Sequence, residues 1–236
     1  MPSSPAGGAP LVPRFVVIGG GADGALYVRQ LLRAVAAGRL RTQALHVVDR
    51  DPACAVARAP HALVRLECAD WNDWLDQHLA AFGPEDHLVP YHWAPHLLLE
   101  WLERQARWAG AVTRRDPVVP PAGVPFERAT RDGARALSYA TWPCPPTCIE
   151  PGLCPHTRGP KSWSLAGDLE AQAALEPLVF RCLHLAYGVA TIPIAALLSA
   201  RARLLSALAA GPRRYLVATS SHCHGLASVL EVFGVG

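Results

Sequence analysis

RFVVIGGGADGALYVRQLLRA, the stretch from Arg14 to Ala34, combines a short apolar run, a group of glycines and a second apolar run with helical spacing. The β-branched residues before the glycines are typical of a buried parallel strand. Gly19, Gly21 and Gly24 then fit the pattern GxGxxG. In that pattern the first glycine allows a sharp turn, the second lets a pyrophosphate approach the backbone, and the third lets helix and strand pack closely. The stretch therefore predicts a strand, a tight turn and a helix whose N-terminus faces an anion.

A second apolar run, ALHVVDRDP, contains Asp49 at its end. A carboxylate at this place can accept hydrogen bonds from the ribose of an adenosine. The strand, the glycine turn and the acid together favour binding of NAD or NADP. Two alternatives stay open, namely a doubly wound domain whose glycine turn serves packing, and one that binds S-adenosylmethionine or another nucleotide.

The composition is that of a folded globular protein. With 236 residues, of which 51% are hydrophobic, the chain can bury a sizeable core. Its formal charge of +3 is small and dispersed, which argues against a nucleic-acid surface. No apolar stretch reaches the roughly 18 to 20 residues that a membrane span needs. The N-terminus lacks the apolar core of a secretory signal, so we expect a disordered leader at residues 1–13 and a cytoplasmic protein.

Apolar and amphipathic segments continue to alternate after Asp49, which predicts a parallel sheet with right-handed crossovers. Residues 14 to 100 thereby resemble the Rossmann-type NAD-binding domains, including the potassium-uptake regulatory nucleotide-binding domains. That family places an acid just after the third strand. Asp70, in LECADWNDWL, occupies this position, and Ala69 stands where the usual glycine precedes it. The resemblance implies that an adenine dinucleotide is bound with Asp70 near its adenine end.

The pattern changes after residue 111, where prolines and glycines replace the helical period, and α/β alternation returns near residue 177. PLVFRCLHL is expected to be one strand and HGLASVLEVFG a closing helix. We therefore expect an α/β fold with a doubly wound, mainly parallel Rossmann-like sheet and an inserted small lobe of β-strands and a cysteine-rich loop. The expected units are a nucleotide-binding half at 14–111, the insertion at 112–176 and a C-terminal completion of the sheet at 177–236.

The inserted loop contains a group of cysteines. Cys144, Cys148 and Cys154 lie close together in a proline-rich segment, and His156 follows them. In a cytoplasmic chain such cysteines favour metal ligands or redox thiols over disulfides. Three thiolates and an imidazole suit tetrahedral zinc, and three thiolates with one further ligand suit an iron–sulfur cluster. The Cys-Pro pairs are similar to ferredoxin-type sequences and slightly favour iron–sulfur, while inert or redox-labile thiols are the alternative.

Several polar residues follow predicted strands. The carboxyl ends of parallel strands meet at one edge of a sheet, where open α/β folds bind ligands. Residues at this edge are candidates for a general acid or base, for the fourth ligand of the cysteine centre, or for a helix cap or phosphate contact. The catalytic candidates are His222, Cys223 and His224, and the others are His92, His96, His184, Ser220 and Ser221.

Three functional hypotheses follow. In the first, an oxidoreductase binds NAD through the glycine turn and Asp49, and electrons pass between the nicotinamide and the cysteine centre. In the second, a regulatory module senses the nucleotide and uses its cysteines as a structural zinc site or a redox switch. In the third, a transferase binds a nucleotide-like donor. We expect a small-molecule substrate or a redox partner, no nucleic acid and no membrane, and the sequence is compatible with a homo-oligomer.

Overall fold

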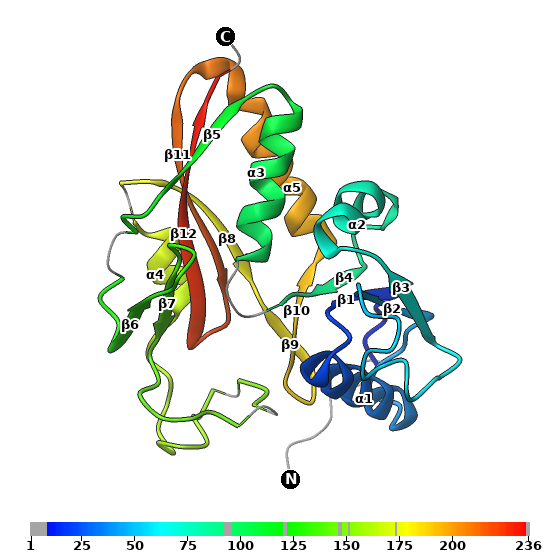
Figure 1. Ribbon diagram of the computed structural model, residues 1–236. Coiled ribbons are helices and arrows are strands. Elements are labelled where there is room, and N and C mark those ends of the chain that lie inside the picture. The colour runs from blue at the N-terminus through cyan, green and yellow to red at the C-terminus, as the bar shows by residue number, and fades with distance from the viewer. Residues whose placement is uncertain are drawn as a thin grey trace.

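The protein, seen here in a computed structural model (Figure 1), is described over residues 9–91, 96–119, 122–145, 148–150, 152–172 and 174–234. Within these ranges the strands form two mixed sheets of six strands each, with helices packed on both. The predicted α/β class is confirmed. The expected single, mainly parallel sheet is not what the structure shows, because the strands divide between two sheets that each contain antiparallel pairs.

The first sheet has the strand order β3-β2-β1-β4-β10-β9. Its strands are β1 (Arg14–Ile18), β2 (Ala44–Asp49), β3 (Val64–Cys68), β4 (His87–Val89), β9 (Leu183–Ala186) and β10 (Val189–Pro193). β1 pairs in parallel with β2 and with β4, and β2 pairs in parallel with β3. β10 is antiparallel to both β4 and β9. Phe15, Val16 and Val17 are fully buried, as expected for a central strand covered on both faces.

The second sheet has the order β6-β7-β12-β11-β8, and β5 also pairs with β12. Its strands are β5 (Val112–Asp116), β6 (Phe126–Ala129), β7 (Arg135–Ser138), β8 (Glu176–Arg181), β11 (Arg213–Ser220) and β12 (His224–Phe233). β8 and β11 are parallel, and the other pairs are antiparallel. Residues 112–176 therefore share this sheet with strands from the C-terminal part of the chain.

The helices cover the sheets and separate them. They are α1 (Ala22–Ala36), α2 (Trp71–His78), α3 (Leu97–Trp108), α4 (Leu165–Glu170) and α5 (Ile194–Ser206), with short 3₁₀ helices at Leu79–Ala81 and Leu208–Ala210. α1 packs on one face of the first sheet, and α4 packs on the outer face of the second. Figure 1 shows α3 and α5 between the two sheets. One core joins Val16 of β1, through α2, α3 and α5, to Tyr215 of β11.

The expected closing helix is wrong, because HGLASVLEVFG contains the whole of the ten-residue strand β12. β12 pairs with β11 on one side and with β7 and β5 on the other. Its residues from Leu226 to Val232 are all buried, including the polar residues Ser228 and Glu231. A largely apolar run of this kind fits a buried strand or a buried helix equally well, and the pairing with three other strands decides the outcome.

The predicted strand PLVFRCLHL is two strands that belong to different sheets. β8 ends at Arg181 in the second sheet, and β9 begins at Leu183 in the first. Figure 1 shows the two in yellow, passing from one sheet to the other. Cys182 lies at the crossing, and its N–H donates to the carbonyl oxygen of Ser220 at 2.8 Å. The chain thus links both sheets at a point next to the end of β11.

Candidate functional site

The glycine turn follows β1 and opens at the start of α1. Gly19 has a φ of 86°, a backbone conformation that favours glycine. The N–H of Gly20 donates to Asp49 Oδ2 at 2.6 Å, and the N–H of Asp51 donates to Asp49 Oδ1 at 2.8 Å. Asp49, predicted to bind a ribose, therefore also holds the glycine turn against the end of β2.

The other two glycines of the pattern have different surroundings. A Cβ placed on Gly24 would lie 1.8 Å from the carbonyl oxygen of Gly19, so only glycine fits where α1 passes the turn. A Cβ placed on Gly21 would meet no described atom within 4 Å. Gly21 is also the N-cap of α1 and supplies no capping side chain. Gly24 thus has a packing role, whereas Gly21 leaves the helix N-terminus accessible.

A pocket of about 90 Å³ lies beside this turn, at the ends of β1 and β4. Besides the glycines, its lining includes Asp23 and Tyr27 from α1 and Tyr91 after β4. Burial, together with the charge of Asp23, raises the pKa of Tyr27 to about 12, so its hydroxyl keeps its proton at neutral pH. The pocket is smaller than the roughly 300 Å³ at which small-molecule sites usually begin.

Asp70, the other predicted cofactor residue, caps the N-terminus of α2 in this structure. Its Oδ1 accepts the N–H of Asn72 at 2.9 Å and of Asp73 at 3.3 Å, which makes it the N-cap of α2. Its Oδ2 lies 3.8 Å from Nε of Arg50. Asp70 does not line the pocket beside the glycine turn.

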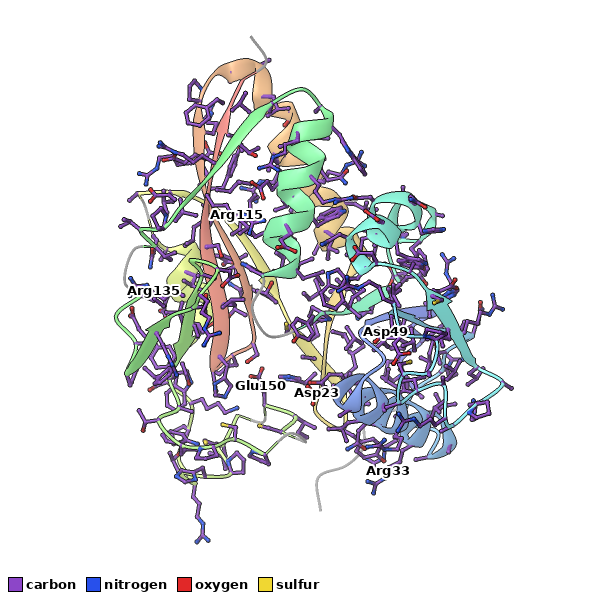
Figure 2. All side chains as sticks on the ribbon, in the orientation of Figure 1. Asp23, Arg33, Asp49, Arg115, Arg135 and Glu150 are labelled. Atoms are coloured by element: carbon purple, nitrogen blue, oxygen red, sulfur yellow. The ribbon has the colours of Figure 1, made fainter. Side chains whose placement is uncertain are left out.

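A larger pocket of about 440 Å³ adjoins the first, and Tyr27 lines both. Its walls come from the cysteine loop, from β6 and β7, from β9 and β10, and from the ends of β11 and β12. Figure 2 labels Glu150 of the cysteine loop, which lines this pocket, and Asp23 of α1, which lines the smaller one. Tyr27 is therefore shared by the pocket beside the glycine turn and the pocket that the cysteine loop lines.

Four cysteines line the larger pocket as neighbours. They are Cys144, Cys148 and Cys154 of the loop and Cys223, which lies between β11 and β12. Burial raises the pKa of the Cys144 thiol, and the nearby thiols of Cys223, Cys148 and Cys154 raise it further. Cys182 lines the same pocket, and its pKa is raised to about 12 by burial and by Glu150. Structure thus adds Cys223 to the three cysteines that the sequence grouped.

The described thiols are not arranged as a finished metal site. All of them are free cysteines, and in the described ranges no three His, Cys, Asp or Glu side chains are placed to hold a metal ion. The chemistry of the donors fits zinc or an iron–sulfur cluster, since both are bound by groups of thiolates. A shared centre would require these side chains to converge.

Two of the sulfurs are close to hydrogen-bond donors. The N–H of Thr157 is the main cause that lowers the pKa of Cys154, and the N–H of His156 acts in the same direction. Nε1 of Trp163 donates to Sγ of Cys223 at 3.4 Å. Burial raises the pKa of Cys223, whereas this indole and Lys161 lower it. Such donors stabilise the thiolate form of cysteine.

Lys161 brings a positive charge to these thiols. It is the only lysine of the sequence and it lines the larger pocket. Its Nζ is buried and has no hydrogen-bond partner in the part of the chain that the structure describes. Its charge lowers the pKa of Cys144, Cys154 and Cys223. A buried ammonium without a partner is costly, so this position favours an anion in the pocket.

Glu150 fixes the cysteine loop to both sheets. Its φ of 50° is unusual for a residue with a side chain. Both carboxylate oxygens accept the N–H of His222, at 2.9 and 3.0 Å, and Oε2 lies 3.1 Å from Nδ1 of His184 on β9. Burial alone would raise the pKa of Glu150, but His184, Ser221 and the N–H of His222 outweigh it and lower the pKa to about 2.

A family model described as AF_1314_C, "Uncharacterized protein, C-terminal domain", matches residues 98–233. The chain belongs to the AF_1314_C family. The match contains the second sheet, the cysteine loop and Cys223, whereas the glycine turn and α1 lie outside it. No curated protein and no solved structure shows significant similarity to the chain. Across the described part of the chain, no helix is both long and apolar enough to cross a membrane.

The predicted histidines of this family member have different surroundings. The His156 ring stacks on Trp142 with centroids 4.6 Å apart. His224 Nδ1 lies 2.9 Å from Oγ of Ser138, and burial lowers the pKa of this histidine. Both His156 and His224 line the larger pocket, whereas His222 does not. The Nε2 atom of His222 is buried and has no hydrogen-bond partner among the described residues.

His96 is part of the core and not of the pocket. It is 2% exposed, and its ring nitrogens lie 3.0 Å from Oγ of Ser228 and 3.0 Å from Oγ1 of Thr219. Burial lowers the pKa of His96 to about 3, so the ring is neutral. Ser220 is buried in β11 and caps no helix, because the segment after it is a strand. His92 lies outside the described residues.

Tyr27, Glu150 and Lys161 are site residues that the sequence did not indicate. Tyr27 has the spacing of an ordinary helix residue, and only its place between the pockets marks it. Glu150 and Lys161 are charged residues within or just after the cysteine loop, and this position could have marked them as candidates. A charged residue in such a loop is usually solvated, so only the tertiary structure shows that these two are site residues.

Proposed function

We propose that this AF_1314_C family member is a redox protein that binds an adenine dinucleotide, NAD in the first place, at the glycine turn and holds a cysteine centre in the adjoining pocket. The observation that carries the proposal is that Tyr27 lines both pockets. A nucleotide that enters by the glycine turn and extends past Tyr27 reaches the cysteines. Its reactive end would then lie close to a centre that accepts or donates electrons.

The strand order supports a Rossmann-like nucleotide site. β3-β2-β1-β4 are parallel and have the order of the first half of a dinucleotide-binding sheet. The small pocket lies at the carboxyl ends of β1 and β4, the two strands between which the connection changes direction. Open α/β sheets bind ligands at this point. The N-terminus of α1, opened by Gly21, would face the pyrophosphate.

The charges near the turn favour NAD over its phosphorylated form. Each oxygen of Asp49 accepts one backbone hydrogen bond and has a further lone pair for a ribose hydroxyl. The same carboxylate would repel a ribose phosphate. Asp23 brings another negative charge into the small pocket, and this charge would repel a pyrophosphate. The positive end of the α1 dipole, at its N-terminus, would have to offset that repulsion.

The thiols support an electron-transferring or structural centre of iron–sulfur or zinc. Cys144, Cys148 and Cys154 would hold it, and the stiff proline-rich loop lowers the cost of ordering them. A bound iron–sulfur cluster would supply one-electron chemistry beside the nucleotide. The residues of the chain would position the thiolates, balance their charge through Lys161 and keep the loop fixed through Glu150.

A second candidate is a nucleotide-sensing module with redox-switch cysteines. It is favoured by one observation, that the described cysteines are free thiols with no three ligands placed for a metal ion. In this case oxidation of two neighbouring thiols would form a disulfide, and the two electrons would pass to the oxidant. Such a protein would be colourless and free of metal when purified.

The nucleotide part is tested by calorimetry with NAD, NADH and their phosphorylated forms. We expect binding to the wild type and none to Gly21→Val, whose folding should be unchanged because the added side chain enters open space. Gly83→Ala is the matched control, since a Cβ there makes only an ordinary contact of 3.6 Å, to Asp86 Oδ2. A wild type that binds none of the four nucleotides would refute the nucleotide site.

The cysteine part is tested on protein purified without oxygen. Metal analysis and the absorption spectrum separate the candidates, because iron–sulfur proteins absorb broadly in the visible and zinc proteins do not. Iron with visible absorption favours the redox protein, and zinc favours a structural centre. Protein without metal, and with a disulfide after mild oxidation, would support the sensing module instead.

A further inference from the structure

The β11–β12 turn reaches the cysteine loop through several contacts. Cys223 stands in this turn, and its carbonyl oxygen accepts the N–H of Tyr139 at 2.9 Å. The carbonyl oxygen of His222 accepts the N–H of Leu165 at 3.1 Å. Glu150 adds the two hydrogen bonds to the N–H of His222. The turn is therefore bound to the segments before, within and after the loop, which fixes Cys223 beside the loop cysteines.

The Cys223 thiol has the burial and the hydrogen bond that are typical of a ligating cysteine. Its residue is 7% exposed, and its sulfur accepts the indole N–H of Trp163. Hydrogen bonds to ligating sulfurs are a regular feature of iron–sulfur sites. Cys182 lines the same pocket, where burial and Glu150 raise its pKa. Cys223 lines the pocket with the loop cysteines, and its thiol is among those that raise the pKa of Cys144.

The histidines are less suited to complete the set. His156 is exposed and its ring lies flat against Trp142, with an angle of 8° between the ring planes. His224 is engaged with Ser138 through Nδ1. His222 keeps a buried Nε2 without a described partner, but it does not line the pocket that the four cysteines share. His222 is therefore the competing ligand that an experiment has to separate from Cys223.

The charge of Lys161 gives an independent argument. Four thiolates around a zinc ion or an oxidised 4Fe–4S cluster leave a net negative charge, and a buried anion of this kind needs a counter-charge. The Nζ of Lys161 is buried in the same pocket without a described partner. An anionic all-cysteine centre would supply that partner. Replacing one thiolate by a neutral imidazole would reduce the negative charge that Lys161 has to balance.

We infer that Cys223 is the fourth ligand of the centre formed with Cys144, Cys148 and Cys154, and that Lys161 is its counter-cation. This inference rests on the proposed function. On binding, each thiol loses its proton to solvent and its sulfur forms a bond to the metal or cluster. The centre then joins the cysteine loop covalently to the β11–β12 turn of the second sheet, in the pocket that Tyr27 also lines.

The first test compares metal content in full-length protein purified without oxygen. We expect Cys223→Ala to lose most of the metal or cluster, as Cys148→Ala does, whereas Cys182→Ala in the same pocket keeps it. His222→Ala and His156→Ala should keep it as well. Full metal in Cys223→Ala, with metal lost in His222→Ala, would overturn the assignment and make His222 the fourth ligand.

The second test keeps all four cysteines and changes the charge beside them. We expect Lys161→Met to weaken metal retention against a chelator by roughly tenfold or more, the usual effect of losing an outer-shell partner, and Lys161→Arg to restore most of it. For an iron–sulfur centre, Lys161→Met should also lower the reduction potential, because an added electron loses a nearby positive charge. Equal retention and equal potential in both variants would overturn the counter-cation role.

The two tests separate this inference from the proposed function. Wild type that contains no metal or cluster would refute the proposed centre, and the inference with it. Wild type that contains metal, with Cys223→Ala unaffected, would refute the inference alone. If Cys223→Ala does not fold, the Lys161 pair still decides whether the centre is anionic.

Discussion

Glu150→Gln removes one charge at the contact that holds the cysteine loop to both sheets. Glutamine has nearly the same shape, so it keeps one acceptor oxygen for the N–H of His222 but has no carboxylate charge beside Nδ1 of His184. The variant therefore resembles the protonated form of Glu150. Its stability relative to the wild type measures what the carboxylate charge contributes to the folded state.

The magnitude follows from the pKa of Glu150. The hydrogen bonds and the charge of His184 lower this pKa from its usual 4.5 to about 2, against the effect of burial. Each unit of pKa is worth about 1.4 kcal/mol, so ionisation of Glu150 stabilises the folded state by about 3 kcal/mol at neutral pH. The side chain is only 14% exposed, so solvent screening reduces this value little.

The sign of the pH dependence is fixed by the direction of the shift. Because the folded pKa lies below the unfolded one, the stabilisation is complete above pH 4.5 and is lost as the pH falls toward 2. Roughly half of the difference in free energy of unfolding between wild type and Glu150→Gln should be lost by pH 3. Denaturant unfolding followed by tryptophan fluorescence measures it, since Trp142 and Trp163 flank the loop.

Glu170→Gln is the matched control, because Glu170 pairs with Arg181 at a more exposed site. We expect the free energy of unfolding of Glu170→Gln to fall by less than about 1 kcal/mol. A loss below about 1 kcal/mol in Glu150→Gln, or a difference that stays constant from pH 7 to pH 3, would show that Glu150 does not hold the loop by its charge.

Two further predictions concern the fold that supports the site. Gly24→Ala should unfold at clearly lower denaturant concentration than Gly21→Val, because its methyl group would meet the carbonyl oxygen of Gly19 at 1.8 Å; equal midpoints would contradict the packing role of Gly24. His96 is held neutral by burial, which lowers its pKa to about 3, so the wild type should lose stability between pH 6.5 and 3 by up to about 1.4 kcal/mol per pH unit. His96→Asn should show a smaller slope in acid unfolding, and an unchanged slope would exclude His96 as its source.

The segments that could be predicted from the sequence are those with a local signal. The glycine turn is one, because Gly19, Gly21 and Gly24 differ in backbone and packing requirements that the spacing encodes. The β-branched runs of β1 and β2 and the amphipathic period of α1 and α3 are others. In each, burial and secondary structure are determined by residues that are near in the chain.

The errors arise where distant pairing decides the structure. β12 has no period that separates a buried helix from a buried strand, and its three neighbouring strands come from other parts of the chain. The break at Cys182 lies inside an apolar run, and only the separation of the two sheets shows that β8 and β9 are different strands. One mainly parallel sheet was the simplest arrangement for such runs.

The candidate site also combines residues with a local sequence signal and residues that only the tertiary structure brings together. The three cysteines of the loop could be grouped from their spacing, but Cys223 joins them only through the fold, and it stood among the sheet-edge residues in the sequence. Tyr27 and Lys161 become candidate site residues only because both line the pocket that contains the thiols. Their chemistry depends on proximity and burial, which no local pattern reports.

The site combines segments from both sheets, and this limits how variants can be interpreted. Tyr27 comes from α1 on the first sheet, while Cys223 belongs to the second, and α2, α3 and α5 join the sheets through one core. We expect a change in that core to disturb the pocket beside the glycine turn and the pocket of the cysteine loop together. Loss of both nucleotide and metal in one variant therefore indicates a damaged core. Only the loss of one, with the other retained, identifies a residue that binds a ligand.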